Sequence, residues 1–491
     1  MEPCGCSRYC GLSRSRRDFI QFAGGVLLTG PSVLSSIARD VAAEKIRRIA
    51  PAGPASKYTP KLKVAFVRRE GEYGMLWPGA IYDGEKALTR YRTQIEKAAM
   101  DLGIQITMQS KPVYSLAEAE AWLAEAAAEK PDGLLVVLLD RQQHAWPTAA
   151  KAIESRIPTV VFAPIGAAFT TNTGPLASKT GVYIASTDDF GQVTYGMRMI
   201  KAGAKLREMR FVVLQGVERR DAALKTLGTK LRFVPANSFL EEYRRTPDDD
   251  EVKQIAAEYL KNATRVAGPT ERDVLNGVKS YVVARNFLER EEGDGITMDC
   301  LGALGKTNVS LPCIAWSRML DHGIPAACEA DIGAAVTHAI VQYLFDRPGF
   351  QQDPVADTSR EALIGAHCTC PTRLNGLSAP PEPFFLSHHH GMRDAVPRPA
   401  WKKGQRITVA IVGGLYQKET LPPHMYISSG TVLDNIPVPP AGGCVVSVAV
   451  KIDGVSDFLD FPGFHQLFFY GDYKKQLGAF CRLFGIEARV V

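Results

Sequence analysis

The sequence predicts an α/β protein with two Rossmann-like domains, each built on a parallel sheet, and a small antiparallel, β-barrel-like domain at the C-terminus. Two observations predict this arrangement. Between residues 61 and 300, short apolar runs alternate with amphipathic stretches at the spacing of strand–helix–strand units. From Arg406 onwards, short β-prone runs separated by Pro and Gly replace this alternation. We therefore expect domains at residues 61–170, 171–395 and 396–491.

The first domain is expected to contain four strands separated by helices. Ser115 stands where an N-cap belongs, and Gly103 stands where a helix ends. The uninterrupted apolar run GLLVVLLD is typical of a strand that is buried on both faces of a parallel sheet. The strands are expected at 61–68, 104–108, 133–140 and 158–163, and the helices at 85–102, 116–129 and 148–156.

The second domain repeats the alternation and contains the clearest helix of the chain. Apolar side chains recur with helical period from Ile332 to Leu344, and Asp331 stands at the N-cap position. The other helices are expected at 191–205, 249–263 and 270–289, and the strands at 210–215 and 295–300.

The C-terminal domain is expected to contain three β-prone runs and a final helix. Short strands that are bounded by Pro and Gly are typical of a small antiparallel sheet or barrel. The runs lie at 406–413, 443–452 and 466–470, and the helix at 473–483 precedes the closing run 486–491.

The composition excludes several classes of protein. With 491 residues, 46% hydrophobic and 22% charged, the chain is too long for one ordinary domain and is neither disordered nor a coiled coil. Its 58 basic and 52 acidic residues are mixed, so no basic arm for nucleic acid is expected. No stretch after residue 45 has the roughly 18 apolar residues that a membrane span needs.

The N-terminus has the features of a twin-arginine export signal. Arg16 and Arg17 are followed by Phe19 and by an apolar stretch that runs to Ile37, where small residues offer cleavage sites. The alternative is a short basic amphipathic helix. We predict a signal at residues 1–45 and a linker at 46–60, with the twin-arginine export machinery as a partner and a periplasmic or other extracytoplasmic location.

The cysteines do not predict a disulfide framework. Seven of the ten lie after the leader, which is an odd number, and their spacings are irregular. We expect most of them to be small, buried, apolar side chains.

Polar side chains that can do chemistry gather in three segments. Glu329 lies among small and apolar residues just before the clear helix, where an unpaired carboxylate is costly and needs a partner. Asp353 follows the far end of that helix. His465 precedes the apolar run QLFFY near the C-terminus.

The segment PAACEADIGAAVTHAIVQYLFDRPGFQQD resembles the metal-binding core of the L-fucose isomerase/L-arabinose isomerase superfamily, on the fucose isomerase side. The segments GITMDCLGALG, IGAHCTCP and GFHQLFFYGDYKKQLGAFCRLFGIE resemble neighbouring blocks of the same family. The resemblance covers roughly residues 60–491 and implies the architecture stated above. It also implies that a neighbouring subunit helps to complete the pocket, so a homo-oligomer is expected.

The resemblance implies a site with three metal ligands. Glu329 and Asp353 would bind a divalent metal and transfer protons, and His465 would be the third ligand. Such a set leaves about three of six octahedral positions for substrate oxygens and water, and it favours Mn²⁺, with Mg²⁺ as the alternative. A hard cation of this kind can stabilise the cis-enediol through which an aldose and a ketose interconvert.

Each of these residues also has a structural interpretation. Glu329 can be a dipole partner of the helix, Asp353 a turn cap, and His465 a core histidine bonded to a carbonyl. Further candidates for substrate binding are Asp299, which could orient a ligand, His367, Trp316 as a stacking surface, and His388 of the run 388–390. Structural hydrogen bonding or aromatic packing is the alternative for them.

Three functional hypotheses follow from the sequence. The first is a metal-dependent aldose–ketose isomerase, with a small-molecule carbohydrate as its partner. The alternative is an exported carbohydrate-binding protein of the same fold without turnover. A metal-dependent hydrolase or lyase that uses the same three residues is the third.

Overall fold

The computed structural model describes residues 46–71, 75–76, 81–141, 143–389, 392–415, 421–437 and 444–491. The predicted export signal and His390 lie outside these residues. Residues Arg48–Val491 form one compact unit. Among the described residues, no helix combines the length and the apolar character that crossing a membrane requires.

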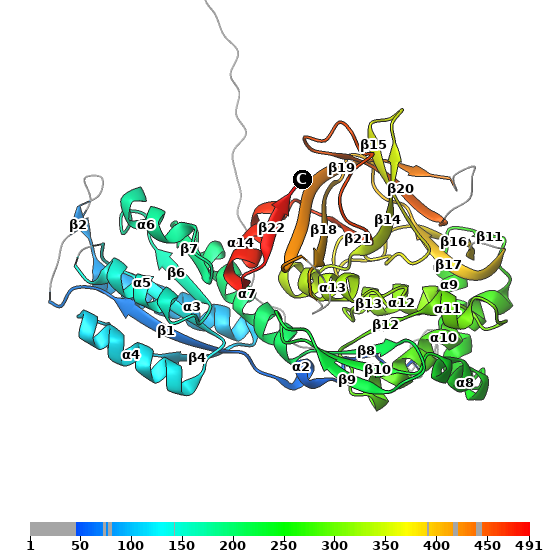
Figure 1. The fold of residues 1–491 in the computed structure, drawn as a ribbon, viewed down its shortest axis with the longest axis horizontal. Coiled ribbons are helices and arrows are strands. Elements are labelled where there is room, and N and C mark those ends of the chain that lie inside the picture. The colour runs from blue at the N-terminus through cyan, green and yellow to red at the C-terminus, as the bar shows by residue number, and fades with distance from the viewer. Residues whose placement is uncertain are drawn as a thin grey trace, which may run out of the picture. The chain divides into compact units, whose positions relative to one another are not determined.

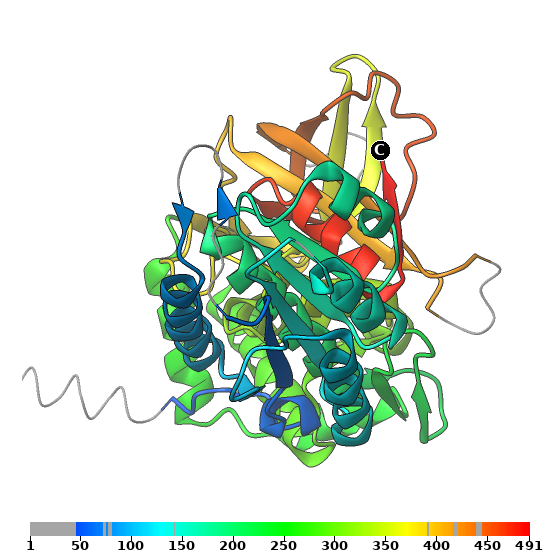
Figure 2. The same ribbon diagram turned by 90° about the vertical axis from the view of Figure 1, so that its left-hand side faces the viewer.

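The first sheet is parallel throughout, as predicted, with strand order β4-β1-β5-β6-β7 (Figure 1). Helices α3 and α7 pack on one face, and α4 and α5 pack on the other, so β5 is buried along its whole length (Figure 2). The elements are β1 (Lys61–Val67), α3 (Gly84–Leu102), β4 (Gln105–Met108), α4 (Leu116–Glu129), β5 (Gly133–Leu138), α5 (Ala145–Glu154), β6 (Thr159–Ala163), α6 (Thr170–Ala177), β7 (Val182–Ser186) and α7 (Phe190–Glu208), with a short hairpin of β2 (Met75–Leu76) and β3 (Ile81–Tyr82).

The second sheet has the order β13-β12-β8-β10-β9. It is parallel except for its edge strand β9, which pairs antiparallel with β10. Its elements are β8 (Arg210–Leu214), β9 (Arg220–Ala223), β10 (Lys230–Val234), α8 (Asn237–Arg245), α9 (Asp250–Asn262), α10 (Glu271–Arg290), β12 (Gly295–Met298), α11 (Cys300–Leu304), α12 (Cys313–Asp321) and β13 (Ala326–Ala327).

Six antiparallel strands close into a barrel, because β18 pairs with both β21 and β19 in the order β18-β21-β14-β15-β20-β19. Strand β22 extends this sheet beyond β19. The strands are β14 (Phe350–Asp357), β15 (Ala362–His367), β18 (Arg406–Gly413), β19 (His424–Ile436), β20 (Val446–Ile452), β21 (Gln466–Tyr470) and β22 (Glu487–Val490), and α14 (Lys474–Phe484) precedes the last of them.

Helix α13 (Ile332–Phe345) forms where the periodicity predicts it. The Asp331 side chain accepts a hydrogen bond from the Ala334 amide, which confirms the predicted N-cap. The helix contacts α7, β13 and the barrel strand β18, and nearly all of its side chains are buried. It therefore joins the parallel sheets to the barrel and holds the segment that precedes it in a fixed place.

Sheet membership does not follow the boundaries that the sequence suggests. Strand β7 belongs to the first sheet although it lies after residue 170, and β14 and β15 belong to the barrel although they lie before residue 396. A separate sheet of β11 (Val266–Ala267), β16 (Phe384–His389) and β17 (Arg393–Pro399) joins residues more than a hundred positions apart. Within the expected linker 46–60, residues Pro54–Lys57 form helix α2, whose Ala55 is fully buried.

Candidate metal centre

Glu329 lies in the short connection between β13 and α13. Glu329 and Ala330 both adopt positive φ angles of 61° and 55°, a conformation that side chains other than Gly rarely adopt. Two backbone hydrogen bonds hold the turn, from Ala330 to the carbonyl of Met298 at 2.8 Å and from Asp331 to that of Cys328 at 3.1 Å. Strained backbone of this kind clusters at functional sites, and here it aims a carboxylate out of an apolar segment.

His465 lies directly before β21 and also has a positive φ, 53°. Its Nδ1 is 2.8 Å from Asp331 Oδ2, and its Nε2 is 3.1 Å from Asp353 Oδ1 and 3.5 Å from Glu329 Oε2. Burial alone would lower the pKa of His465, but its contacts with Asp331, Asp353 and Glu329 outweigh burial and raise the pKa to about 11. Three acidic side chains therefore surround one nearly buried imidazole.

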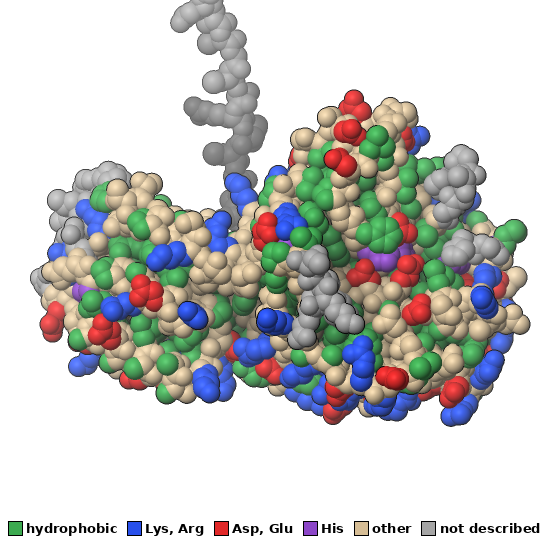
Figure 3. All heavy atoms as spheres, viewed as in Figure 1, with side chains coloured by type: hydrophobic (Ala, Val, Ile, Leu, Met, Phe, Trp, Pro, Cys, Tyr) green, Lys and Arg blue, Asp and Glu red, His purple; other side chains and the backbone are tan. Residues whose placement is uncertain are grey.

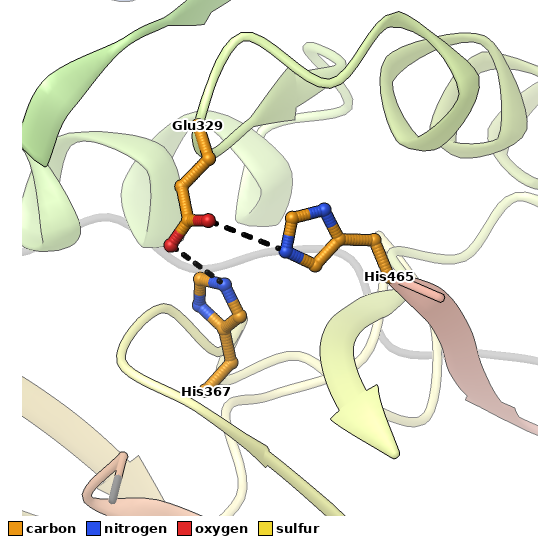
Figure 4. A group of neighbouring side chains, drawn as sticks. All are labelled: Glu329, His367 and His465. Atoms are coloured by element: carbon orange, nitrogen blue, oxygen red, sulfur yellow. Dashed lines mark ion pairs between the residues drawn. The ribbon is translucent and has the colours of Figure 1, made fainter. Parts of the chain in front are cut away.

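Asp353 and His367 are brought side by side by strand pairing. Asp353 on β14 pairs with Ala366 on β15, and His367 is the next residue along β15. His367 is buried, which lowers its pKa, and its Nε2 lies 3.8 Å from Glu329 Oε1. Figure 4 shows the Glu329 carboxylate with one oxygen turned towards the His367 ring and the other towards the His465 ring, and the two ring centres are 5.6 Å apart.

Several buried polar atoms at this place lack a hydrogen-bond partner. They are Oδ1 of Asp353, Nε2 of His465 and both ring nitrogens of His367. The approach of Asp353 Oδ1 to His465 Nε2 at 3.1 Å therefore does not have the angles of a hydrogen bond. Buried polar atoms are almost always satisfied, so this group calls for a partner that accepts lone pairs.

The spacing of these atoms fits a metal ion. Ligand atoms of Glu329, His367 and His465 all lie within 4.8 Å of one another. Donors about 2.1 Å from one ion lie about 3.0–3.4 Å apart, depending on coordination geometry. The separation of 3.1 Å lies within this range, and those of 3.5 and 3.8 Å are slightly wider, so a small inward movement would complete the set. Asp331 does not belong to the donor set, because its carboxylate is occupied with His465 Nδ1 and the N-terminus of α13.

The cluster opens to solvent on one side. The histidine side chains are 4–5% exposed, whereas those of Glu329, Asp353 and Asp331 are 35%, 31% and 27% exposed. Figure 3 shows a place on the molecular face where histidine and acidic side chains gather beside hydrophobic ones. A bound ion would therefore have protein donors beneath it and free coordination positions towards solvent.

The structure brings together the three residues that the sequence singled out as metal ligands, Glu329, Asp353 and His465, and their roles as ligands remain a prediction. It adds His367, which was expected to contact substrate, as a fourth donor at the cluster. It also adds Asp331, whose second function beyond the N-cap was missed because it depends on a contact 134 positions away.

The other candidates lie elsewhere. Trp316 lies on α12, and its side chain is 0% exposed in the protein core. The expectation that it stacks on a sugar is therefore wrong, and the aromatic-packing alternative holds. The Asp299 carboxylate caps α11 through the amide of Gly302, and His388 Nδ1 lies 3.1 Å from the carbonyl of Asp394. Neither has a contact with the cluster among the described residues.

All seven described cysteines are thiols, and six of them are buried. This agrees with the expectation that they are small apolar side chains without a disulfide framework. The buried Cys328 thiol, next to Glu329, donates a hydrogen bond to Thr369 Oγ1 at 3.3 Å.

No family model matches the chain, and no curated protein does. Solved structures that match include a periplasmic solute-binding protein of an ABC transporter from Actinobacillus succinogenes with bound D-allose (13% identity, 58% of this chain and 92% of that chain, TM-score 0.20). A sugar ABC transporter structure from Yersinia enterocolitica matches with 13% identity, 61% and 82% coverage and a TM-score of 0.20. A sugar-binding protein from Bacillus halodurans matches with 16% identity, 61% and 91% coverage and a TM-score of 0.17.

These findings correct the resemblance to the L-fucose isomerase/L-arabinose isomerase superfamily. No model or curated protein of that superfamily matches, and the solved structures named above are sugar ABC transporter proteins. The expectations of isomerase activity and of manganese, which followed from the resemblance, lose their support with it. Structural similarity with TM-scores of 0.20 and below does not support a function, so a function has to be inferred from the residues of the site.

Proposed function

We propose that this protein binds carbohydrate outside the cytoplasm through a divalent cation, without turnover. One observation carries the proposal: Asp353, His367 and His465 converge with buried ring nitrogens and a buried carboxylate oxygen that lack hydrogen-bond partners. The Glu329 carboxylate, from a separate segment, lies within 4.8 Å of the ligand atoms of both histidines. The predicted twin-arginine signal supports the extracytoplasmic location, because it sends a folded protein across the membrane.

The four side chains would hold the cation, and Asp331 would fix the orientation of His465. A carboxylate on the outer nitrogen of a ligating histidine sets its tautomer and ring angle. Mixed nitrogen and oxygen donors suit a divalent first-row metal, and two imidazoles make the set more nitrogen-rich than the expected three-ligand site. Their presence is the reason why no preference for manganese is proposed.

Carbohydrate fits the open side of this site. Four protein donors leave about two of six octahedral positions, and these would face solvent between the partly exposed carboxylates. Two adjacent hydroxyl oxygens of a sugar can fill neighbouring positions on one cation, whereas remaining lone pairs of Glu329 and Asp353 can accept the hydroxyl protons. A ligand with only one oxygen donor would lack this chelation.

The test measures metal and sugar binding separately. The full chain is stripped of metal on a chelating resin and titrated by calorimetry with Mg²⁺, Ca²⁺, Mn²⁺, Co²⁺ and Zn²⁺. A panel of aldoses, ketoses and deoxy sugars is then titrated with and without the best metal. We expect one ion per chain, and sugar binding that requires it. Sugar binding of equal strength in the stripped protein would overturn the role of the cation, and absence of any sugar binding would overturn the proposal.

The Glu329→Gln variant sharpens the test. The change keeps the size of the side chain but removes the charge that faces both histidines, so metal affinity should fall at least tenfold. Glu361→Gln is the matched control, because it makes the same change at the exposed turn between β14 and β15, where Glu361 pairs with Lys451. Equal metal affinity in the two variants would remove Glu329 from the site.

A further inference from the structure

Strands β11, β16 and β17 form a small three-stranded sheet (Figure 1). Two arginines and an aromatic ring form a row across it. Phe385 on β16 pairs directly with Arg398 on β17. On the other side, Arg265 immediately precedes β11, and its carbonyl accepts a hydrogen bond from Leu386 at 3.0 Å. The register of three strands thus places Arg265, Phe385 and Arg398 next to one another.

Both guanidinium groups lie over the same ring. The Cζ atom of Arg265 is 4.3 Å from the centre of the Phe385 ring, and that of Arg398 is 5.0 Å from it. Cation–π contacts hold a guanidinium plane in place while leaving its N–H edge open. Among the described residues, the only hydrogen bond that the Arg398 side chain donates is a long one of 3.5 Å to the carbonyl of Ile436.

These two positive charges lack a counter-charge. Within the described part of the chain, neither Arg265 nor Arg398 forms an ion pair with a carboxylate, in contrast to most arginines here that are as buried as Arg398. Burial and the nearby charge of Arg265 both lower the pKa of Arg398. Arg265 is exposed and Arg398 is partly buried, so the cost of an unpaired charge falls mainly on Arg398, and a bound anion would recover that cost.

A cavity of about 190 Å³ lies beside this pair, and Phe385, Arg398, Thr264, Asn435 and Ser447 line it. The neutral polar groups already have partners. Thr264 Oγ1 donates to the carbonyl of Phe384 at 3.0 Å, Ser447 Oγ donates to that of Cys444 at 3.0 Å, and the Asn435 amide bonds the backbone of Trp401 on both sides. Of the two arginines, Arg398 lines the cavity and Arg265 lies further from it, so the N–H groups of Arg398 are the ones that face a ligand there directly.

We propose that Arg265 and Arg398 bind a small oxoanion, the sulfate, phosphate or carboxylate group of a ligand, in the cavity beside Phe385. The planar fork of a guanidinium matches two oxygens of such a group, and a space of this size accommodates a tetrahedral anion or a carboxylate. The anion is either a free inorganic ion or the charged group of an acidic sugar. This site is independent of the cation site and of the proposed function.

The test titrates the full chain with anions after metal has been removed on a chelating resin, because soluble chelators are anions themselves. Calorimetry in a low-salt, phosphate-free buffer uses sulfate, phosphate, glucose 6-phosphate and glucuronate as probes. We expect at least one of them to bind at one site per chain. A sugar probe that binds at least tenfold more tightly than the inorganic ions identifies an acidic carbohydrate, and equal or weaker binding identifies a free oxoanion. No binding by any probe would overturn the proposal.

Variants assign the site to these residues. Arg398→Gln should lower the affinity for the best-binding probe at least tenfold. Arg265→Gln should lower it at least threefold, since Arg265 lies further from the cavity lining. The affinity of Arg398→Lys for the probe should lie between those of Arg398→Gln and the parent protein, because a lysine keeps the charge but lacks the planar fork of the guanidinium. Arg245→Gln, an exposed arginine at the end of α8, is the matched control and should bind as the parent does.

Removing either charge relieves repulsion, so the Gln variants should melt no lower than the parent in the absence of anion. Anion binding that is equal in Arg398→Gln and in the parent would overturn the assignment, whatever the metal and sugar experiments show.

Discussion

His465 is held from two directions, and this arrangement sets the chemistry of the candidate site. Asp331 binds Nδ1 at 2.8 Å, while Asp353 and Glu329 face Nε2 at 3.1 and 3.5 Å. A carboxylate behind a histidine and further donors in front of it is the arrangement that orients an imidazole towards a metal. The same contacts keep the metal-free imidazole protonated.

Replacing His465 by Ala should weaken metal binding by roughly tenfold or more, because it removes a donor and leaves Asp331 without its partner. Calorimetric titration of the stripped variant measures the change. His424→Ala is a suitable control, since His424 Nδ1 lies 2.9 Å from the carbonyl of Pro422 and, among the described residues, His424 forms no ion pair with the cluster. Unchanged metal affinity in His465→Ala would reject it as a ligand.

Asp331 has two separable roles, and two variants distinguish them. Asn can still accept the hydrogen bond from the Ala334 amide, so Asp331→Asn should keep the stability of α13 but lower metal affinity by roughly tenfold or more. Asp331→Ala removes both the capping acceptor and the carboxylate that faces His465, so it should also lower the free energy of unfolding by about 1 kcal/mol. Urea unfolding and metal titration of both variants give the comparison. Parent-like metal binding in both would leave Asp331 as a helix cap only.

The raised pKa of His465 predicts how metal binding depends on pH. A cation must displace the proton that this imidazole carries up to a pKa of about 11, so metal affinity should rise roughly tenfold per pH unit between about pH 7 and 9.

The folding stability of the metal-free protein should change with pH in the opposite direction and fall as the pH rises. The stability that protonated His465 contributes is complete below its ordinary pKa of 6.5 and is lost as the pH rises through about 11. Metal titrations at three pH values check the predicted affinities, and a metal affinity that is the same at all three would contradict them.

At the scale of elements, α13 couples the cation site to the barrel. Its N-terminus carries Asp331, and the Oγ1 atom of Thr337 one turn later accepts a hydrogen bond from the buried Val412 amide of β18 at 3.1 Å. The same hydroxyl donates to the Gly333 carbonyl at 2.7 Å. The helix therefore has a fixed register against the strand, and the loop with Glu329 is held in place with it.

Thr337→Val should lower the free energy of unfolding by about 1–3 kcal/mol, because Val has nearly the same shape but leaves the buried Val412 amide without an acceptor. Chemical unfolding measures the loss. Thr89→Val is the control, since the Thr89 hydroxyl is exposed and bonds only within its own helix. The control should change stability by less than about 0.5 kcal/mol. A similar small change in Thr337→Val would show that the link is weak.

At the scale of the whole molecule, the candidate ligands tie together three segments that span residues 329 to 465. A cation that binds only the folded chain stabilises it by mass action, by about 2.7 kcal/mol at a metal concentration one hundred times the dissociation constant. We therefore expect the stripped protein to melt at a lower temperature than the metal-loaded protein. The difference should become clearly smaller in Glu329→Gln but stay unchanged in Glu361→Gln. An identical melting temperature with and without metal would argue against a bound cation.

The sequence by itself determined the elements whose signals are local. Apolar runs predicted β1, β5 and β6, and the period of α13 together with Asp331 predicted a helix and its cap, because periodicity and capping depend on residues a few positions apart. Glu329 could also be singled out, since a carboxylate among small and apolar neighbours is visible in the sequence, whereas the resemblance implied the ligand roles of Glu329, Asp353 and His465.

Only the tertiary structure decided how these parts meet. The closure of β18 on β19 and the pairing that sets Asp353 beside His367 depend on the register between segments. The Asp331–His465 contact and the row of Arg265, Phe385 and Arg398 likewise join residues more than a hundred positions apart. Register and distant packing are set by the sum of many weak contacts in the folded core, and no short stretch of sequence records that sum.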